Sequence, residues 1–252
     1  MTATTRVGVL GKSGRMGSLV GETIDAAADL ELVAITDGGA EGLSPMVDAG
    51  AQVVVDFTHP DAVMAHAKYL VEHGISVVIG TSGVGADRQQ EIQGWLVDRL
   101  DVAVLVIPNF AIGAVLAMRF TREAARFFES VEIIELHHAG KADAPSGTAA
   151  NTLREVAAAR AAAGLSTIPD ATTSDPAGAR GAVLDGGVHV HSVRLPGLVA
   201  HQEALLGSEG ELLTIRHDSL HRSSFMPGVL LAVRSALARP GLTVGLEALL
   251  GL

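Results

Sequence analysis

Short apolar runs alternate with stretches of helical periodicity along the first half of this chain, and this alternation limits the fold more than any other feature. The apolar runs lie at residues 6–10, 30–36, 52–57, 75–79 and 102–107. Helical patterns fill three of the intervals between them, at residues 17–28, 60–74 and 86–100. Strands that are joined through helices form right-handed crossovers and lie parallel in one sheet. The sequence therefore predicts an α/β domain with a doubly wound parallel sheet.

The pattern changes after Pro108. Helical stretches follow at residues 111–128 and 148–163, a strand at 131–136, and period-two alternation at 188–195 and 211–217. Alternation of this kind is typical of antiparallel strands with one covered face. The second part is therefore expected to be an α+β domain built on a mixed sheet, with a long polar loop over residues 166–187.

Two domains follow from this change of pattern. A last helix is predicted over residues 225–237, and we expect it to return to the first domain. The first domain then comprises residues 1–109 and 218–252, and the second comprises residues 110–217.

A glycine-rich turn separates the first predicted strand from the first predicted helix. Gly11, Gly14 and Gly17 are spaced G-x-x-G-x-x-G, and Asp37 ends the second strand. Glycines in such a turn permit close backbone approach to a pyrophosphate, and the free N–H groups of the helix N-terminus attract its charge. An acid at the end of the second strand accepts hydrogen bonds from the adenosine ribose. Together these features predict a Rossmann-like dinucleotide site.

The charges around this turn leave the choice of cofactor open. The carboxylate of Asp37 favours NADH because it would repel a 2′-phosphate. Lys12 and Arg15 lie in the same turn and would offset that repulsion, so NADPH is equally compatible. Two further loops, at residues 80–83 and 108–110, follow strands at the edge where ligands bind in open α/β sheets.

A second group of reactive side chains lies between residues 135 and 148. His137 and His138 end a predicted strand, Lys141 follows, and Ser146-Gly147-Thr148 opens a helix. Each residue alone has an ordinary interpretation, as a strand-end imidazole, a solvated charge or a helix N-cap. Their clustering favours a site where a helix N-terminus and a lysine bind carboxylates while a histidine supplies a proton.

Composition excludes several other classes of function. The chain has 252 residues. Its formal net charge of −10 argues against nucleic-acid binding. It has no cysteine, which excludes disulfides and thiolate chemistry. Adjacent histidines lack the spacing of a zinc site, so no metal is expected there or at His189, His191, His217 and His221. Residues 1–5 show no secretory signal, and the longest apolar stretch, 110–118, is too short to span a bilayer. We therefore expect a cytoplasmic protein without a membrane partner.

The segment ELHHAGKADAPSGTA resembles the signature E-[LI]-H-H-x-x-K-x-D-A-P-S-G-T of dihydrodipicolinate reductases. The resemblance extends to GKSGRMG, VVVDFTHP, GTSG, PNFAIGAVL, HSVRLPGLVAHQE and TIRHDSLHRSSF, so it covers nearly the whole chain. It implies reduction of 4-hydroxy-tetrahydrodipicolinate, a cyclic dicarboxylate, to tetrahydrodipicolinate by NADH or NADPH in lysine and diaminopimelate biosynthesis. It also implies two hinged domains, the second of which binds the substrate and builds a homotetramer.

The resemblance assigns a role to each matching position. His137 would be the proton donor and Lys141 its cationic partner. The substrate carboxylates would be held by His138, Lys141, Ser146, Gly147 and Thr148. The cofactor would be lined by Gly11, Lys12, Ser13, Gly14, Arg15, Met16, Asp37, Gly80, Thr81, Ser82, Ile107, Pro108, Asn109 and Phe110.

Three positions depart from the pattern of many relatives. Gly140 and Gly38 stand where basic residues are common, and Lys12 replaces a small residue. Two other functions fit the glycine turn: a different imine or amino-acid dehydrogenase, and a non-catalytic NAD(P) sensor. Neither has a use for the segment that contains His137 and Lys141.

Overall fold

The computed structural model describes residues 4–165 and 167–252, and these residues form two compact units. Unit one runs to Ile112 and resumes at Phe225–Leu252, whereas unit two is Gly113–Ser224. The sequence predicts the boundaries slightly earlier, after residues 109 and 217. Residues 1–3, in the polar start, and Ser166, the first residue of the predicted loop, lie outside the described residues.

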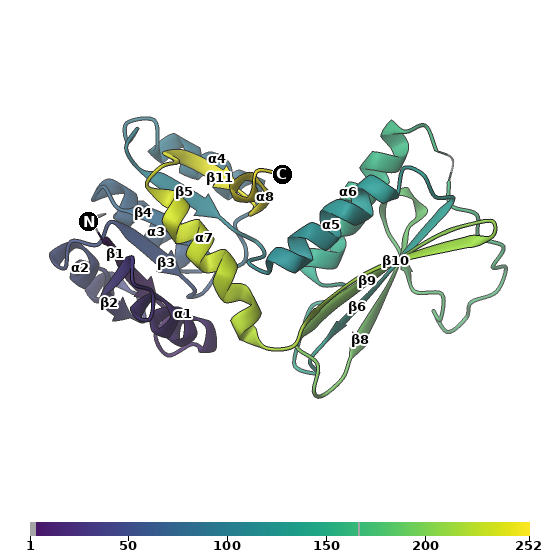
Figure 1. Cartoon of the computed structure of the whole chain (residues 1–252), viewed down its shortest axis with the longest axis horizontal. Helices are drawn as coiled ribbons and strands as arrows, with labels where there is room; N and C mark the ends of the chain where they lie inside the picture. The colour runs from purple at the N-terminus through teal and green to yellow at the C-terminus, as the bar shows by residue number, and fades with distance from the viewer. Residues whose placement is uncertain (1–3, 166) are drawn as a thin grey trace. The chain divides into compact units, whose positions relative to one another are not determined.

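Unit one is built on a sheet in which each pair of neighbouring strands is parallel, which confirms the predicted doubly wound fold (Figure 1). The strand order is β11-β5-β4-β3-β1-β2. The strands are β1 (Thr5–Leu10), β2 (Leu30–Thr36), β3 (Val53–Asp56), β4 (Ser76–Ile79), β5 (Ala103–Val106) and β11 (Gly241–Val244). The order reverses between β1 and β3, because β2 lies on one side of β1 and the later strands lie on the other. Ligands of open α/β sheets bind at such a reversal, outside the carboxyl ends of the strands.

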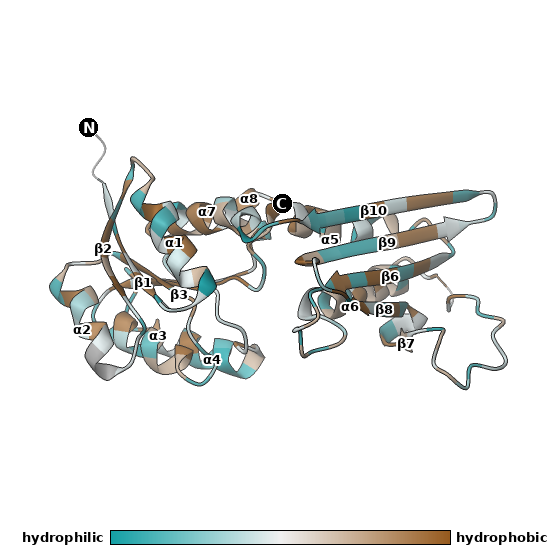
Figure 2. Ribbon diagram, turned by 90° about the horizontal axis from the view of Figure 1, so that it is seen from below, coloured by the Kyte–Doolittle hydropathy of each residue, from teal (hydrophilic) through white to brown (hydrophobic). Residues whose placement is uncertain are grey.

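Helices cover both faces of this sheet. They are α1 (Arg15–Asp25), α2 (Ala40–Asp48), α3 (Val63–Glu72), α4 (Ala86–Trp95), α7 (Met226–Ala236) and α8 (Glu247–Leu250). Helices α1 and α7 lie on one face and α2, α3 and α4 on the other (Figure 1). Since both faces are covered, the central strands are continuous apolar runs, such as the fully buried Val53–Val55 (Figure 2). The last long helix packs on β3, β4 and β5, as predicted.

Unit two contains a mixed sheet of strand order β10-β9-β6-β8-β7, as predicted. Its strands are β6 (Ser130–His137), β7 (Ala182–Val183), β8 (His189–Arg194), β9 (Ala200–Ser208) and β10 (Glu211–Ser219). Strand β6 pairs with β8 in parallel, and the other pairs are antiparallel. Two helices, α5 (Ile112–Ala124) and α6 (Gly147–Ala162), contribute to the core on one face of the sheet (Figure 1). Short 3₁₀ turns occur at η1 (Asp185–Gly187) and η2 (Arg222–Phe225).

The parallel pairing of β6 with β8 requires a crossover, which α6 provides. As a result the N-terminus of α6 follows directly on the carboxyl end of β6. Unit one repeats this order, because α1 follows directly on the carboxyl end of β1. None of the helices in the described ranges combines the length and the apolar character that crossing a bilayer would require.

Close approach of two glycines shapes the turn between β1 and α1. Gly11 has φ 99°, in the region that favours glycine, and its carbonyl oxygen faces the first turn of α1. A Cβ atom at Gly17 would collide with that oxygen. The spacing of the turn glycines is therefore a packing requirement of this strand–helix junction.

We predict that Gly17→Ala lowers the free energy of unfolding by about 2 kcal/mol, because the backbone of Gly11 must move to admit the methyl group. Urea unfolding followed by circular dichroism measures this loss. Gly94→Ala in α4 is the matched control, because a Cβ atom there has no neighbour within 4 Å. The control should unfold at the same or a slightly higher urea concentration, since alanine favours helix by up to about 1 kcal/mol. Equal stability of Gly17→Ala and the parent protein would contradict this account.

Candidate active site

The glycine turn and Asp37 lie together, as the sequence predicts. The backbone N–H of Ser13 donates to Oδ1 of Asp37 at 2.6 Å, and the N–H groups of Gly11 and Lys12 donate to the carbonyl of Thr36. The hydrogen bonds from Ser13 hold the pKa of Asp37 below its ordinary value, and the charge of Lys12 lowers it further. Asp37 is exposed and ionised, so its second oxygen can accept hydrogen bonds from a ribose hydroxyl.

The N-terminus of α1 is suited to an anion. Gly14 is the N-cap residue of this helix, and it has no side chain that could cap the first turn. Residues 12–15 are exposed, and they include the cations Lys12 and Arg15. The backbone N–H groups of a first helical turn have no partner within the helix, so they can bind a phosphate oxygen.

Phe57 joins the other two predicted cofactor loops. Its ring packs against Gly80 so closely that a Cβ atom there would collide with it, and its centroid lies 5.4 Å from that of Phe110. Both Phe110 and Ile107 are buried, so these two residues can face a ligand only through their peptide groups. Of the remaining predicted residues, Met16 and Asn109 are partly exposed, Pro108 and Ser82 are exposed, and Thr81 is buried.

In unit two, the buried carboxylate of Glu135 organises the predicted chemical site. One of its oxygens is hydrogen-bonded to Nδ1 of His137, and Arg194 donates to both oxygens at 2.8 and 3.0 Å. Burial alone would raise the pKa of Glu135, but hydrogen bonds from Arg194, Ser192 and His137 lower it below its ordinary value. Glu135 is therefore an acceptor, so His137 donates through Nδ1 and leaves Nε2 for a ligand.

The same carboxylate connects the strand to the start of α6. The backbone N–H of Ser146 donates to Glu135, and Oγ of Ser146 accepts from the N–H of Ala149 as an N-cap. A Cβ atom at Gly147 would have no neighbour within 4 Å, so open space adjoins the first turn of the helix. Thr148 is partly exposed in that turn. Ser146, Gly147 and Thr148 thus form a helix N-terminus that a carboxylate can approach.

Lys141 and His138 lie in the turn between β6 and α6. The N–H of Lys141 donates to the carbonyl of His138, and Nζ of Lys141 donates to Asp143 at 2.7 Å. That ammonium group lowers the pKa of Asp143. His138 is exposed, and Lys141 retains donors beyond the one that Asp143 accepts.

The pKa of His137 lies below its ordinary value. Burial is the main cause, and the charges of Lys141 and Arg194 lower it further, whereas the charge of Glu135 raises it. Imidazole is consequently the resting form near neutral pH. A dianionic ligand would favour the protonated form, because an anion stabilises a nearby cation.

The sequence alone does not identify Glu135 and Arg194 as site residues, although Glu135 binds His137 and Arg194 binds Glu135. They are 59 positions apart, and the parallel register of β6 and β8, in which His137 pairs with Arg194, brings them together. The sequence gives one indication of Arg194, because it lies in HSVRLPG, a segment that resembles the family. Only the register of β6 and β8 shows that this arginine pairs with Glu135, because no neighbouring residue in the sequence indicates it.

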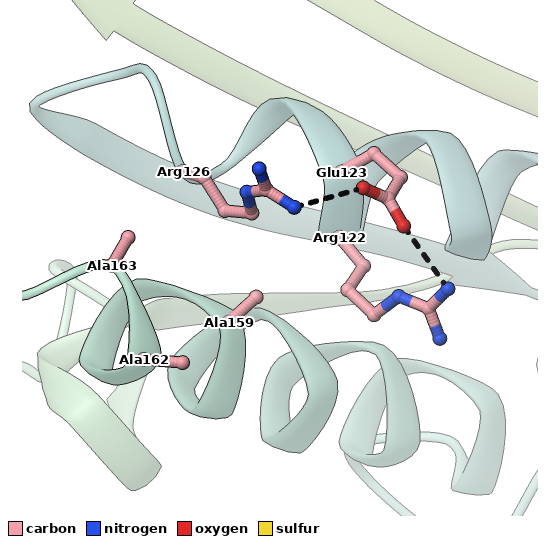
Figure 3. A pocket seen from close by; sticks show the side chains of 6 residues that line it. All are labelled: Arg122, Glu123, Arg126, Ala159, Ala162 and Ala163. Carbon is pink, nitrogen blue, oxygen red and sulfur yellow. Dashed lines mark hydrogen bonds and ion pairs between the residues drawn. The ribbon is translucent and has the colours of Figure 1, made fainter.

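Two of the remaining histidines are paired with carboxylates. His189 pairs with Asp170 and His191 with Glu132, and the described residues contain no group of three or more His, Cys, Asp or Glu side chains that could hold a metal. A separate hollow lies between α5 and α6 (Figure 3). Arg122 and Arg126 in this hollow both pair with Glu123, and no predicted site residue lines it.

Two family models match the chain: "Dihydrodipicolinate reductase, N-terminus" over residues 5–110 and "Dihydrodipicolinate reductase, C-terminus" over residues 113–250. The 4-hydroxy-tetrahydrodipicolinate reductase of Nocardia farcinica is 60% identical over 249 residues, which cover 99% of this chain and 100% of that protein. The reductase of Mycobacterium sp. strain KMS is 57% identical over 98% of this chain and 99% of its own length. A solved structure, dipicolinate-bound dihydrodipicolinate reductase from Paenisporosarcina sp. TG-14, has 37% identity and a TM-score of 0.82, covering 97% of this chain and 99% of that one.

We predict that Lys141→Ala raises the pKa of His137, because it removes a positive charge that disfavours the imidazolium form. NMR titration of protein with ¹³C-labelled histidine measures the shift, and the signal lost in His137→Gln identifies the residue. The exposed Lys68 of α3 provides the control, since Lys68→Ala should leave the titration unchanged. An unchanged or lower pKa in Lys141→Ala would show that the ammonium group exerts no effective field on the imidazole.

Proposed function

This chain belongs to the dihydrodipicolinate reductase family, and from that premise we propose how its own residues carry out the reaction. The protein is an NAD(P)H-dependent oxidoreductase that reduces 4-hydroxy-tetrahydrodipicolinate to tetrahydrodipicolinate in lysine and diaminopimelate biosynthesis. The observation that carries the assignment of roles is the Glu135 carboxylate, which joins His137, Arg194 and the start of α6.

The first unit fits the cofactor. Gly11 and Gly17 leave no space for side chains in the turn, the start of α1 is uncapped, and Asp37 is held as an ionised acceptor. NADH or NADPH supplies the hydride when it is bound. In this proposal residues 11–16 bind the pyrophosphate and Asp37 the adenosine ribose, while residues 80–82 and 107–110 line the cofactor, chiefly through peptide groups.

The second unit binds the substrate carboxylates. Ser146, Gly147 and Thr148 offer a helix N-terminus to one of them. Lys141 supplies positive charge, and both Lys141 and His138 supply hydrogen-bond donors. A dicarboxylate substrate is consistent with the dipicolinate bound to the related reductase from Paenisporosarcina. The net charge of −10 makes the local positive charge of Lys141 and of the helix N-terminus necessary, because the protein as a whole repels a dianion.

His137 supplies the proton. Its Nδ1 is held by Glu135, so Nε2 is the atom that delivers a proton to the reduced ring. Glu135 remains ionised and stabilises the imidazolium that forms when substrate binds, while Arg194 keeps Glu135 in place. The charge of Lys141 lowers the pKa of His137, which makes its imidazolium form a stronger acid toward the reduced ring.

We further propose that the protein is a cytoplasmic homotetramer without nucleic-acid or membrane partners. The helices of unit two contribute to the core on one face of its sheet, and side chains of the opposite face include Leu205, Leu212 and Arg216. Leu212 is 68% exposed, and a sheet face with such residues is suited to pairing with another copy.

A non-catalytic sensor is the alternative function, but a sensor would not need the hydrogen-bonded Glu135–His137 pair.

We expect NADH and NADPH to be oxidised only when substrate is generated in place, from pyruvate and aspartate semialdehyde by a dihydrodipicolinate synthase. Loss of absorbance at the nicotinamide band measures the reaction, and omission of the synthase is the control. The ratio of the two rates reveals whether Asp37 or the Lys12 and Arg15 pair dominates the choice of cofactor. A folded protein that binds cofactor but oxidises neither form would overturn the reductase assignment in favour of a sensor or another dehydrogenase.

We predict that His137→Gln lowers kcat at least about 100-fold with little change in the Kd for NADH, because a general acid is lost while the cofactor site is intact. Lys141→Ala should lower kcat and also raise the KM for substrate, because Lys141 acts in both steps. The coupled assay and fluorescence titration of NADH measure these constants. His73→Gln, at an exposed position at the end of α3, is the control and should match the parent. Parent-level turnover in either variant removes that residue from the mechanism.

A further inference from the structure

A second buried carboxylate, Asp56, lies at the carboxyl edge of the sheet in unit one. It is the last residue of β3, has no exposed surface, and pairs in register with Leu10 on β1 and Ile79 on β4. It therefore lies where the strand order reverses between β1 and β3. Its partner Leu10 directly precedes Gly11, so Asp56 is next to the start of the glycine turn. A buried charge is costly unless it is fully hydrogen-bonded, so the groups around it define its role.

Four hydrogen bonds satisfy this carboxylate. Oδ1 accepts from the N–H of Thr58 at 2.8 Å, from Oγ1 of Thr58 at 2.6 Å and from Oγ1 of Thr81 at 2.9 Å. Oδ2 lies 2.9 Å from Nδ1 of His66 on α3. Asp56 thus connects the loops that follow β3 and β4, and it fixes the ring of a histidine that is itself buried.

The partners of His66 define its tautomer. Nδ1 faces the carboxylate of Asp56 and donates to it, whereas Nε2 accepts from the backbone N–H of Gly39 at 3.2 Å. A neutral imidazole has one donor and one acceptor, so both ring nitrogens are used. The hydrogen-bond chain runs from Asp56 through His66 to the backbone just beyond Asp37.

Two glycines make up that backbone segment, and glycine restricts the backbone conformation less than any other residue. Gly38 and Gly39 have φ 88° and 90°, and neither carries a side chain that could hold the segment. A Cβ atom at Gly38 would lie 2.6 Å from Cε1 of His66, so the imidazole fills the space beneath this peptide. Besides His66, the side chain of Thr36 accepts from the N–H of Gly38 at 3.3 Å.

We infer that His66, held by Asp56, is a positioning residue for cofactor binding, because it orders the Gly38–Gly39 segment that carries Asp37 toward the adenosine ribose. This inference rests on the cofactor site proposed above. Ordering the two glycines in the free protein spares their conformational entropy at the moment of binding. His66 then affects how tightly the adenosine half of the cofactor binds, and not the reduction itself.

Two amide substitutions separate the two bonds of the imidazole. In His66→Asn the amide replaces Nδ1, so the bond to Asp56 survives and the acceptor for Gly39 is lost. In His66→Gln the longer side chain places its amide oxygen near Nε2 and restores that acceptor. We expect His66→Asn to raise the Kd for NADH about tenfold with kcat at saturating NADH within about twofold of the parent, and His66→Gln to recover most of the affinity.

Titration calorimetry with NADH and with ADP-ribose, which contains the adenosine ribose but no nicotinamide, tests the location of the effect. Both Kd values should rise by the same factor in His66→Asn, whereas a general loss of structure would also lower kcat and the thermal midpoint. An unchanged Kd for NADH, or a weaker NADH affinity with unchanged ADP-ribose affinity, overturns the inference. If His66→Asn does not fold, His66→Gln still tests it, because an affinity more than about threefold below that of the parent would contradict the role of Nε2.

Asp37→Ala separates this inference from the function on which it rests. Weaker binding of ADP-ribose in Asp37→Ala, together with parent-like binding in His66→Asn, rejects only the role of His66. Parent-like binding in both variants rejects the proposed cofactor site as well. Weaker binding in both variants supports the two proposals together.

Discussion

The geometry of the second unit depends on one interaction, the hydrogen-bonded burial of Glu135 in the middle of a sheet. A carboxylate without exposed surface is stable only when each oxygen has donors, and here Arg194, His137 and the N–H of Ser146 supply them. Those donors come from β8, β6 and the start of α6. Removal of any one of them would leave charge or a polar group unpaired, so strand register, histidine tautomer and helix start are coupled.

The two units differ in sheet type but have the same local arrangement at their proposed sites. In each unit a strand ends, a short turn follows, and a helix begins at the site proposed for a ligand: β1 and α1 in unit one, β6 and α6 in unit two. The positive end of a helix suits the pyrophosphate of a dinucleotide and the carboxylate of a small substrate equally well. The turns differ because their tasks differ. Glycines admit close approach of a phosphate, whereas the turn in unit two carries the lysine and the second histidine.

Much of this fold could be predicted from local pattern, and the failures have physical causes. Both faces of the first sheet are covered, so its central strands are unbroken apolar runs that are visible in the sequence. Strand β9 was not predicted, because it lies between β6 and β10 and buries His201 and Gln202, which breaks the alternation. Strand β11 is only Gly241–Val244, and α2 contains Pro45, a residue that normally argues against helix. Tertiary packing overrides the local signal in all three.

The candidate site shows the same division. Residues close together in sequence, such as His137, Lys141 and Ser146, were recognisable as a cluster, whereas Arg194 reaches it only through the register of β6 and β8. The sequence likewise gives no role to Asp56 and His66. An aspartate at the end of a strand and a histidine in a helix are both common, and neither indicates that the two are bonded to each other.

Comparison of the two carboxylate–histidine pairs shows how burial separates their roles. Glu135 and Asp56 each bind Nδ1 of a histidine, so in both pairs Nε2 is the ring nitrogen left for a second partner. The side chain of His137 is 14% exposed, and its Nε2 is available to a ligand, whereas that of His66 is 4% exposed and its Nε2 binds the N–H of Gly39. An imidazole that can reach a substrate can transfer a proton to it, but one enclosed by backbone can only hold that backbone in place. Under the two proposals above, the same chemical pair serves proton transfer at one strand end and loop geometry at the other.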